Sequence, residues 1–292
     1  MQHGKVILIA GPTASGKSAL ALRLAGERGG VIINADSMQV YRELRILSAR
    51  PTAEDEACVP HRLYGHVPAA EAYSAGRYAI EAAQAIAEAR TLGRGAIVVG
   101  GTGLYFKTLI EGLSPIPAIP EDVRRRWRRK AEHCGAGELH KVLAGRDPEM
   151  AQRLCPSDPQ RVVRALEVLE ATGRSLARWQ EEPGTPIIDL TTAERLVVEA
   201  DRDALYRRCD ARFEAMMEAG ALDEVSALAA LGLPAGLPAM RALGVRPLMQ
   251  HLAGQVSLEE AVAAAKRETR QYVKRQLVWL KRNMNAWAAI KT

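Results

Sequence analysis

The chain has 292 residues, of which 48% are hydrophobic and 25% charged, with a net charge of +6; this is the composition of a globular protein. No apolar run approaches the roughly 20 residues of a membrane span, and the first strand begins too early for a secretory signal, so we expect a cytoplasmic protein with no membrane partner. The four cysteines are widely spaced and include no Cys-x-x-Cys pair, which argues against a zinc site and a disulfide framework.

The first predicted strand leads into a phosphate-binding motif. Residues 6–10 are an apolar run, strong helix formers follow from residue 19, and the segment between them fits G-x-x-x-x-G-K-[ST]. In such a loop, backbone N–H groups and the start of a helix bind phosphate, Lys17 reaches the outer phosphate and Ser18 Oγ ligates Mg²⁺. The alternative is a chance match in an ordinary strand–turn–helix. The motif predicts a di- or triphosphate site made of Gly11, Pro12, Thr13, Ala14, Ser15, Gly16, Lys17 and Ser18.

A second buried strand is predicted over residues 31–35, and Asp36 follows it directly. In open α/β sheets the site lies beyond the carboxyl ends of the strands, so Asp36 should share an edge with the phosphate-binding loop. It could hold Mg²⁺ through water or accept a proton from a substrate; a plain helix N-cap is the alternative. A third strand is predicted over 61–67 and a helix over 74–90.

The next predicted strand ends in Gly-Gly-Thr at residues 100–102. Many NTPases that drive motion or unwinding have Asp or Glu at this stage, so its absence argues against an ATP-hydrolysing motor. The glycines predict a close approach of the backbone to a ligand, and Thr102 offers a hydroxyl.

Three prolines within residues 115–120 interrupt the regular pattern, and helical patterns then continue to about residue 179. One of these helices should begin with Asp158 as N-cap and Pro159 in its first turn, and end at Gly173. We therefore expect an α/β fold: a P-loop NTPase-like core with a parallel sheet, made of residues 1–113 and 195–292. An inserted all-helical lid domain should span 114–194.

Residues 195–200 return to strand character, residues 203–231 are predicted to be helical, and a last helix should begin near Ser257 with Glu260 completing a capping box. From Arg241 to the end there are ten Lys or Arg residues and three acidic ones. This excess suggests a polyanionic partner, with a solvated helix face as the alternative.

Taken together, these stretches resemble the tRNA dimethylallyltransferases, also called tRNA isopentenyltransferases. The resemblance covers nearly the whole chain in order. Its most specific part runs from Asp36-Ser37 through the Gly-Gly-Thr turn to Asp-Pro-Gln-Arg at 158–161. The last matching stretches of the chain are Thr-Arg-Gln at 269–271 and Lys-Arg-Gln at 274–276. The chain has no zinc finger before Thr292, and in this it resembles the compact bacterial members of the family.

The resemblance implies transfer of the dimethylallyl group from dimethylallyl diphosphate to N6 of adenosine 37, beside the tRNA anticodon, with Mg²⁺ as cofactor. Asp36 would be the general base, Thr102 would lie at the reacting centre, and Lys17 would stabilise the diphosphate. The partner would be the anticodon stem-loop, bound by a protein that we expect to be monomeric. Expected RNA contacts are Asp36, Ser37, Met38, Gln39, Thr102, Arg124, Gln160, Arg161, Val162, Val163, Arg164, Arg241, Arg246, Arg270 and Lys274.

One loop departs from the family pattern. Where the family usually has a Gly-Thr-Ala-Lys-Pro-like stretch, this chain has Leu-Ser-Ala-Arg-Pro at 47–51, so Ser48 and Arg50 would have to replace Thr and Lys. Two other functions stay open from the residues alone. A small-molecule or nucleotide kinase would share the loop and the lid, and a non-catalytic RNA-binding protein could keep a vestigial nucleotide site, against which the intact Lys17, Ser18 and Asp36 argue.

Overall fold

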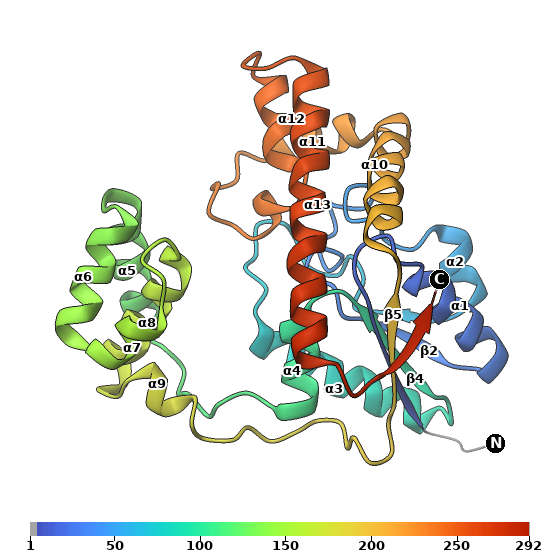
Figure 1. Ribbon diagram of the computed structural model, residues 1–292, viewed down its shortest axis with the longest axis horizontal. Helices are drawn as coiled ribbons and strands as arrows, with labels where there is room; N and C mark the ends of the chain where they lie inside the picture. Colours follow the sequence, from blue (N-terminus) through green and yellow to red (C-terminus); the bar gives the residue numbers. More distant parts are fainter. Residues whose placement is uncertain (1–4, 292) are drawn as a thin grey trace. The chain divides into compact units, whose positions relative to one another are not determined.

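The computed structural model describes residues 5–291 and divides the chain into two compact units (Figure 1). The core unit contains the residues up to Ile110 and those from Ile187 onward, and the helical unit is Glu111–Pro186. The second boundary is fixed where the chain returns: the N–H groups of Ile187 and Ile188 both donate to the carbonyl of Leu109, at 2.9 and 3.0 Å. Residues 187–194, expected in the insertion, therefore lie in the core unit, and residues 111–113, expected in the core, lie in the helical unit.

The core unit is built on one parallel sheet of six strands, which confirms the predicted fold class (Figure 1). The strand order is β3-β2-β4-β1-β5-β6. The bounds are β1 (Val6–Ala10), β2 (Val31–Asn34), β3 (His61–Arg62), β4 (Ala96–Gly100), β5 (Glu194–Glu199) and β6 (Ala288–Lys291). The prediction of a third strand over 61–67 is wrong beyond Arg62, because Leu63 and Gly65 adopt positive φ and turn the chain away from the sheet.

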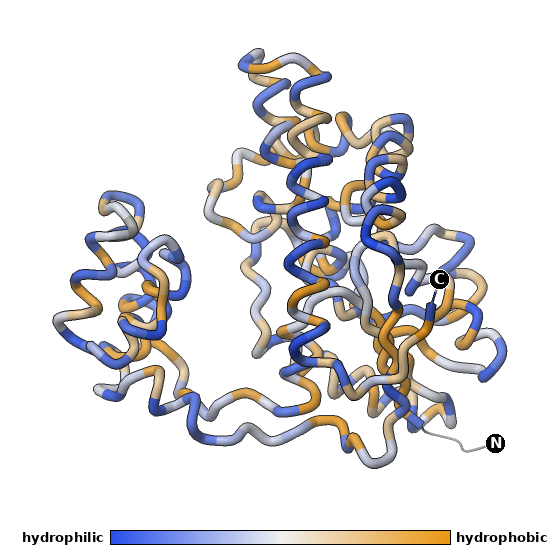
Figure 2. Tube along the Cα trace, viewed as in Figure 1, coloured by the Kyte–Doolittle hydropathy of each residue, from blue (hydrophilic) through white to orange (hydrophobic). Residues whose placement is uncertain are grey.

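Both faces of the sheet are buried, as the unbroken apolar strands require. One face packs Ile7, Ile9 and Ile97 against α1 (Lys17–Arg28), and the other belongs to the largest apolar cluster, to which α3 (Ala75–Thr91) and α4 (Gly103–Glu111) contribute. Figure 2 shows the strands as the most continuously hydrophobic part of the trace. Loops at the carboxyl ends of the strands are consequently held on a rigid base.

Helices complete the core unit: α2 (Ala53–Cys58), α10 (Arg202–Glu218), α11 (Ala221–Ala230), a short 3₁₀ helix (Ala239–Arg241), α12 (Val245–Leu252) and α13 (Leu258–Asn283). The segment predicted to be helical over 203–231 forms two helices, which Gly220 separates with a φ of 96°. The start of α13 is confirmed: Ser257 Oγ accepts from the N–H of Glu260, and the Glu260 carboxylate accepts from that of Ser257.

The helical unit has its own apolar core. It contains α5 (Glu121–His133), α6 (Ala136–Arg146), α7 (Pro148–Arg153), α8 (Pro159–Thr172) and α9 (Leu176–Trp179). Trp127, Leu143 and Leu166 are buried together in a cluster that shares no member with the core unit. The predicted limits of α8 are confirmed, with Asp158 as N-cap and Gly173 in the left-handed conformation at its end.

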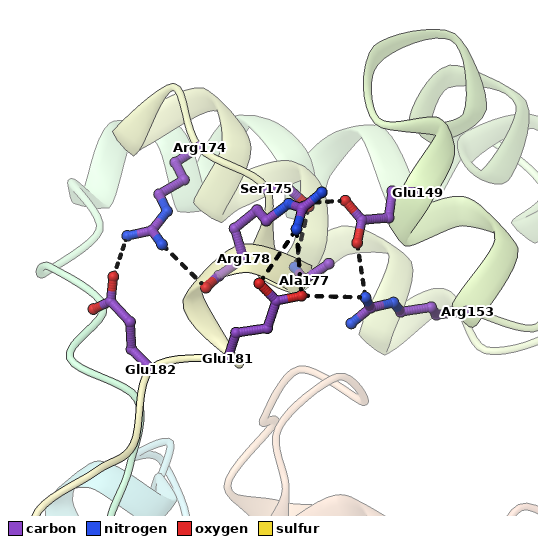
Figure 3. Close-up of polar contacts among 8 residues, drawn as sticks. All are labelled: Glu149, Arg153, Arg174, Ser175, Ala177, Arg178, Glu181 and Glu182. Carbon is purple, nitrogen blue, oxygen red and sulfur yellow. Dashed lines mark hydrogen bonds and ion pairs between the residues drawn. The ribbon is translucent and has the colours of Figure 1, made fainter.

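Ion pairs at the surface join α7 to α9 and the residues that follow it (Figure 3). Glu149 receives Arg153 at 2.7 Å and Arg178 at 3.1 Å, and Arg178 also reaches Glu181 at 3.3 Å. These four side chains are between one-third and about half exposed, so water screens the pairs. Glutamates of the helical unit therefore neutralise part of its basic charge.

Candidate active site

Loops that follow β1, β2 and β4 meet at the carboxyl edge of the sheet, where the sequence predicted a site. They are the phosphate-binding loop at 11–18, the segment 35–41, and the Gly-Gly-Thr turn at 100–102. The N–H of Gly11 donates to Gly100 at 3.3 Å, and the N–H of Thr102 donates to Ala35 at 3.2 Å. The three loops therefore form one connected surface.

The phosphate-binding loop has the conformation that its motif predicts. Ala14 and Gly16 both have positive φ, the N–H of Ser15 donates to the carbonyl of Pro12 at 3.3 Å, and α1 begins at Lys17. Lys17 Nζ folds back to the same carbonyl at 3.2 Å, so its charge lies over the loop. The helix start and the ammonium group together suit an anion.

Lys17 is one of three charged groups that converge here. Burial lowers its pKa to about 8, Asp36 opposes that shift, and Arg212 of α10 adds to it. Burial also lowers the pKa of Arg212, again against the attraction of Asp36. Arg212 belongs to no motif and was not predicted as a site residue. It lies one turn after the buried Cys209, and Cys209 Sγ is 3.9 Å from the carbonyl of Thr13. Two cations and one carboxylate thus share the site.

Asp36 is held through its backbone by a buried amide. Asn34 Oδ1 accepts from the N–H of Asp36 at 2.8 Å, and Asn34 Nδ2 donates to the carbonyl of Asp36 at 2.9 Å. The Asp36 carboxylate accepts from the N–H of Met38 at 2.9 Å in a tight turn. The alternative of a helix N-cap is wrong, because no helix follows Asp36. Its carboxylate remains available for chemistry at the edge of the sheet.

Thr102 binds the segment that carries Asp36. Its Oγ1 accepts from the N–H of Ser37 at 3.0 Å and donates to Ser37 Oγ at 3.3 Å, and the hydroxyl of Tyr272 of α13 lies close to it. Burial and the nearby charge of Asp36 raise the pKa of Tyr272, which keeps this hydroxyl protonated. The expectation that the glycines approach a ligand is wrong for Gly100, since a Cβ there would lie 2.1 Å from the carbonyl oxygen of Ala35. That glycine instead lets two loops of the protein touch.

The divergent loop at 42–51 consists of turns that side chains from outside the loop hold in place. The Glu224 carboxylate of α11 accepts from the N–H groups of residues 45, 46 and 47 at 2.7–2.9 Å, and Gln39 Nε2 donates to the carbonyls of Ser48 and Ala49. Ser48 Oγ donates to the carbonyl of Leu44, and the Arg50 guanidinium donates to two backbone carbonyls. Ser48 and Arg50 therefore stabilise the loop from within.

The predicted RNA contacts of the core unit have different surroundings. Ser37, Met38 and Gln39 are half-buried at the rim of the site, and Arg241 and Arg246 line a cavity of about 640 Å³ between α12 and α13. Arg270 forms a tight ion pair with Asp210 of α10, both N–O distances being 2.6 Å. Lys274 is exposed. Lys266 of α13 is paired with Glu214, and Arg246 of α12 lies 2.8 Å from Glu268, so part of the basic charge of this region is neutralised inside the protein.

The remaining predicted contacts lie in the helical unit. Arg124 is half-buried on α5, Gln160 and Arg161 are exposed on the first turn of α8, and Arg164 is 3.6 Å from Glu167. Burial lowers the pKa of Arg164, with the neighbouring Arg124 acting in the same direction. Val162 and Val163 are buried in the core of this unit, so the prediction that they contact RNA is wrong for their side chains.

The site could hold a magnesium ion that the protein and the diphosphate bind together. Among residues 5–291 no group of three or more His, Cys, Asp or Glu side chains could hold a metal by itself. Mg²⁺ commonly takes one or two protein ligands and completes its shell with phosphate oxygens and water. The Ser18 hydroxyl, exposed in the first turn of α1, could supply one such ligand, and diphosphate oxygens and water would complete the shell.

Family models and related proteins place this chain in one family. The chain matches the model of the IPP transferase family over residues 39–283 and that of isopentenyl transferase over residues 4–68. It is 54% identical to the tRNA dimethylallyltransferase of Parvibaculum lavamentivorans, covering 99% of this chain and 91% of that protein. The enzyme of Azorhizobium caulinodans is 55% identical, with coverages of 96% and 90%.

Two solved structures extend the comparison to three dimensions. The tRNA isopentenylpyrophosphate transferase of Bacillus halodurans is 34% identical with a TM-score of 0.69, covering 99% of this chain and 90% of that one. A eukaryotic dimethylallyltransferase acting on tRNA is 28% identical with a TM-score of 0.83, covering 98% and 73%. In the part of the chain that is described, no helix is both long and apolar enough to cross a bilayer.

Proposed function

The chain belongs to the IPP transferase family, and from that membership we infer its function: it is a tRNA dimethylallyltransferase. It transfers the dimethylallyl group from dimethylallyl diphosphate to N6 of adenosine 37 in tRNA. One observation connects this reaction to the site. The charge of the Asp36 carboxylate acts on both Lys17 and Arg212, raising the pKa of each against burial, at the edge of the sheet where the phosphate-binding loop opens.

The two kinds of group match the two halves of the reaction. When the allylic C–O bond breaks, its electron pair leaves with the diphosphate, and negative charge grows there. Lys17, Arg212 and the loop N–H groups supply positive charge at that place before the reaction begins, which stabilises the transition state. We propose that dimethylallyl diphosphate binds with its diphosphate over residues 11–18.

Asp36 serves the nucleophile in this proposal. The N6 amine of adenine is a weak nucleophile, and it must lose a proton as its lone pair forms the C–N bond. The Asp36 carboxylate, oriented by Asn34 and by the turn to Met38, accepts that proton. Thr102 accepts from the N–H of Ser37 and so fixes the position of the Asp36 segment relative to the Gly-Gly-Thr turn. Mg²⁺ held by Ser18 would add charge neutralisation at the leaving diphosphate.

The RNA must present a single unstacked base to this site. A base inside a stacked loop cannot reach the edge of the sheet, so the nucleotide has to be flipped out, which costs least from a single-stranded loop. We propose that the anticodon stem-loop is bound by exposed basic residues of both units, including Lys274 of α13 and Arg161 of α8. The helical unit would act as the lid that the sequence suggested.

The direct test is mass spectrometry of tRNA nucleosides. The purified protein should convert adenosine 37 to its N6-dimethylallyl form when given unmodified tRNA, dimethylallyl diphosphate and Mg²⁺, and ATP should be neither consumed nor required. Lys17→Ala should abolish most of the product, because it removes charge from the leaving-group site. Product that depends strictly on ATP would indicate a kinase-type use of the loop.

A further inference from the structure

We propose that Gln276 of α13 is a positioning residue, which sets the diphosphate-binding loop against the turn that carries Thr102. The proposal rests on the function proposed above for the phosphate-binding loop. It concerns a residue that the sequence placed in a Lys-Arg-Gln stretch without any role.

The Gln276 side chain joins two loops that come from different strands. Its Oε1 accepts from the N–H of Thr13 at 2.9 Å, and its Nε2 donates to the carbonyl of Gly101 at 3.0 Å. Gln276 is 5% exposed, and the two backbone groups that it bonds belong to half-buried residues. A donor on one side and an acceptor on the other allow only one orientation of the amide.

The turn is shaped to receive this amide. A Cβ at Gly101 would lie 2.3 Å from Gln276 Nε2, so any larger residue there would displace the side chain. Four residues earlier on the same face of α13, the Tyr272 hydroxyl lies close to Thr102 and to Gln276. Two successive turns of one helix therefore face the Gly-Gly-Thr turn, and the second of them is hydrogen-bonded both to this turn and to the phosphate-binding loop.

The two halves of the phosphate-binding loop therefore have different roles. The N–H of Thr13 is committed to Gln276, which fixes the first half of the loop and leaves Lys17 and the start of α1 to face the diphosphate. Without Gln276, the half-buried Thr13 N–H and Gly101 carbonyl would lose these partners, and the two loops would separate as both groups turn toward water. The leaving group and the base at Asp36 would then lose their fixed spacing.

Two variants separate the two hydrogen bonds. Gln276→Met keeps the length of the side chain and removes both. Gln276→Glu keeps an acceptor for Thr13 and turns an oxygen toward the carbonyl of Gly101. The matched control is Thr269→Val, on the same buried face of α13, because the Thr269 hydroxyl donates only to the carbonyl of Ala265 within the helix.

The readout is the affinity for inorganic pyrophosphate with Mg²⁺, measured by calorimetry, together with the two KM values. We expect Gln276→Met to weaken pyrophosphate binding and raise KM for dimethylallyl diphosphate by about tenfold, the worth of one or two buried hydrogen bonds, with KM for tRNA changed less than twofold. Gln276→Glu should be affected at least as strongly, and it carries the test if the Met variant does not fold. Thr269→Val should lower Tm without changing either affinity.

Two failures can be told apart by including Lys17→Ala. If Lys17→Ala loses pyrophosphate binding while both Gln276 variants keep wild-type affinity, Gln276 has no positioning role and the inference alone is overturned. If Lys17→Ala also binds pyrophosphate normally, the diphosphate site itself is misplaced, and the inference falls with it.

Discussion

The two units of the molecule use polar side chains in different ways. In the core unit, buried groups such as Asn34 and Gln276 hold the loops of the site through hydrogen bonds that exclude water. In the helical unit, Arg153 and Arg178 pair with glutamates at the surface. Breaking a buried hydrogen bond costs about 1–3 kcal/mol, whereas an exposed ion pair contributes about 0–1 kcal/mol. Substitutions of these buried groups should therefore affect chemistry, whereas substitutions in the helical unit should affect RNA binding or nothing.

The largest effect is expected at Asp36. Asp36→Asn has nearly the same shape, so fold and tRNA binding should persist, but it cannot accept the proton and kcat should fall by roughly 10²–10⁴. Asp201→Asn, which keeps an N-cap at the start of α10, is the control and should be close to wild type. Full rescue of Asp36→Asn by raising Mg²⁺ would instead make Asp36 a metal ligand.

The next effect is a pH dependence from Lys17. Its pKa of about 8 means that the free enzyme loses this charge as pH rises through 8, so pyrophosphate affinity should fall by up to about tenfold per pH unit above that value. Lys17→Arg stays charged and should remove this dependence, which calorimetry at several pH values would show. Identical pH profiles for both proteins would contradict the role of Lys17.

The same shift has a consequence for stability. The folded pKa of Lys17 lies below its ordinary value of 10.5, so the unfolded chain binds more protons between these two values. The ligand-free protein should therefore gain stability as pH rises from about 8 to 10.5, and this contribution should be absent in Lys17→Met. Denaturant unfolding at the two ends of that range measures it.

The helical unit should respond in RNA binding alone. Replacing Arg124 and Arg164 together by Gln should reduce the slope of log affinity against log salt by about 1.5, because each phosphate contact contributes roughly 0.7–0.9. The affinity for pyrophosphate should not change. A loss of pyrophosphate binding in this variant would erase the distinction between the units.

Within α13 the ion pairs predict a contrast between two basic residues. Arg270 is paired with Asp210, whereas Lys274 is exposed. Lys274→Gln should lower the salt slope by about 0.8, and Arg270→Gln should leave it nearly unchanged. An equal reduction for both would show that RNA displaces Asp210 from Arg270. Salt titrations of tRNA binding with the two variants decide between these results.

The smallest effect is expected in the surface network of Figure 3. Arg178→Gln removes pairs with Glu149 and Glu181 that water already screens, and it should change the free energy of unfolding by less than about 1 kcal/mol. Activity should equal that of the wild type. A larger loss of stability would show that the network acts as a unit.

Local signals in the sequence determined much of this protein. The conformation of the phosphate-binding loop, the start of α13 at its capping box and the limits of α8 are confirmed, because each depends on residues close together in the chain. The parallel sheet is confirmed as well, because unbroken apolar strands are typical of a sheet buried on both faces. The strand predicted over 61–67 is wrong beyond Arg62, where the positive φ of Leu63 and Gly65 redirects the backbone, and the helical segment predicted over 203–231 is divided at Gly220. Such a reversal leaves the hydrophobic pattern unchanged.

Only the tertiary structure decided which distant side chains complete the site. Thr13 and Gln276 are 263 positions apart, and Arg212 reaches Lys17 and Asp36 from a helix far along the chain. Helical periodicity marks a buried face by its apolar residues, so it cannot distinguish a buried amide with two partners from an exposed one. It also cannot show that Asp210 neutralises Arg270, because that pairing depends on how α10 packs against α13.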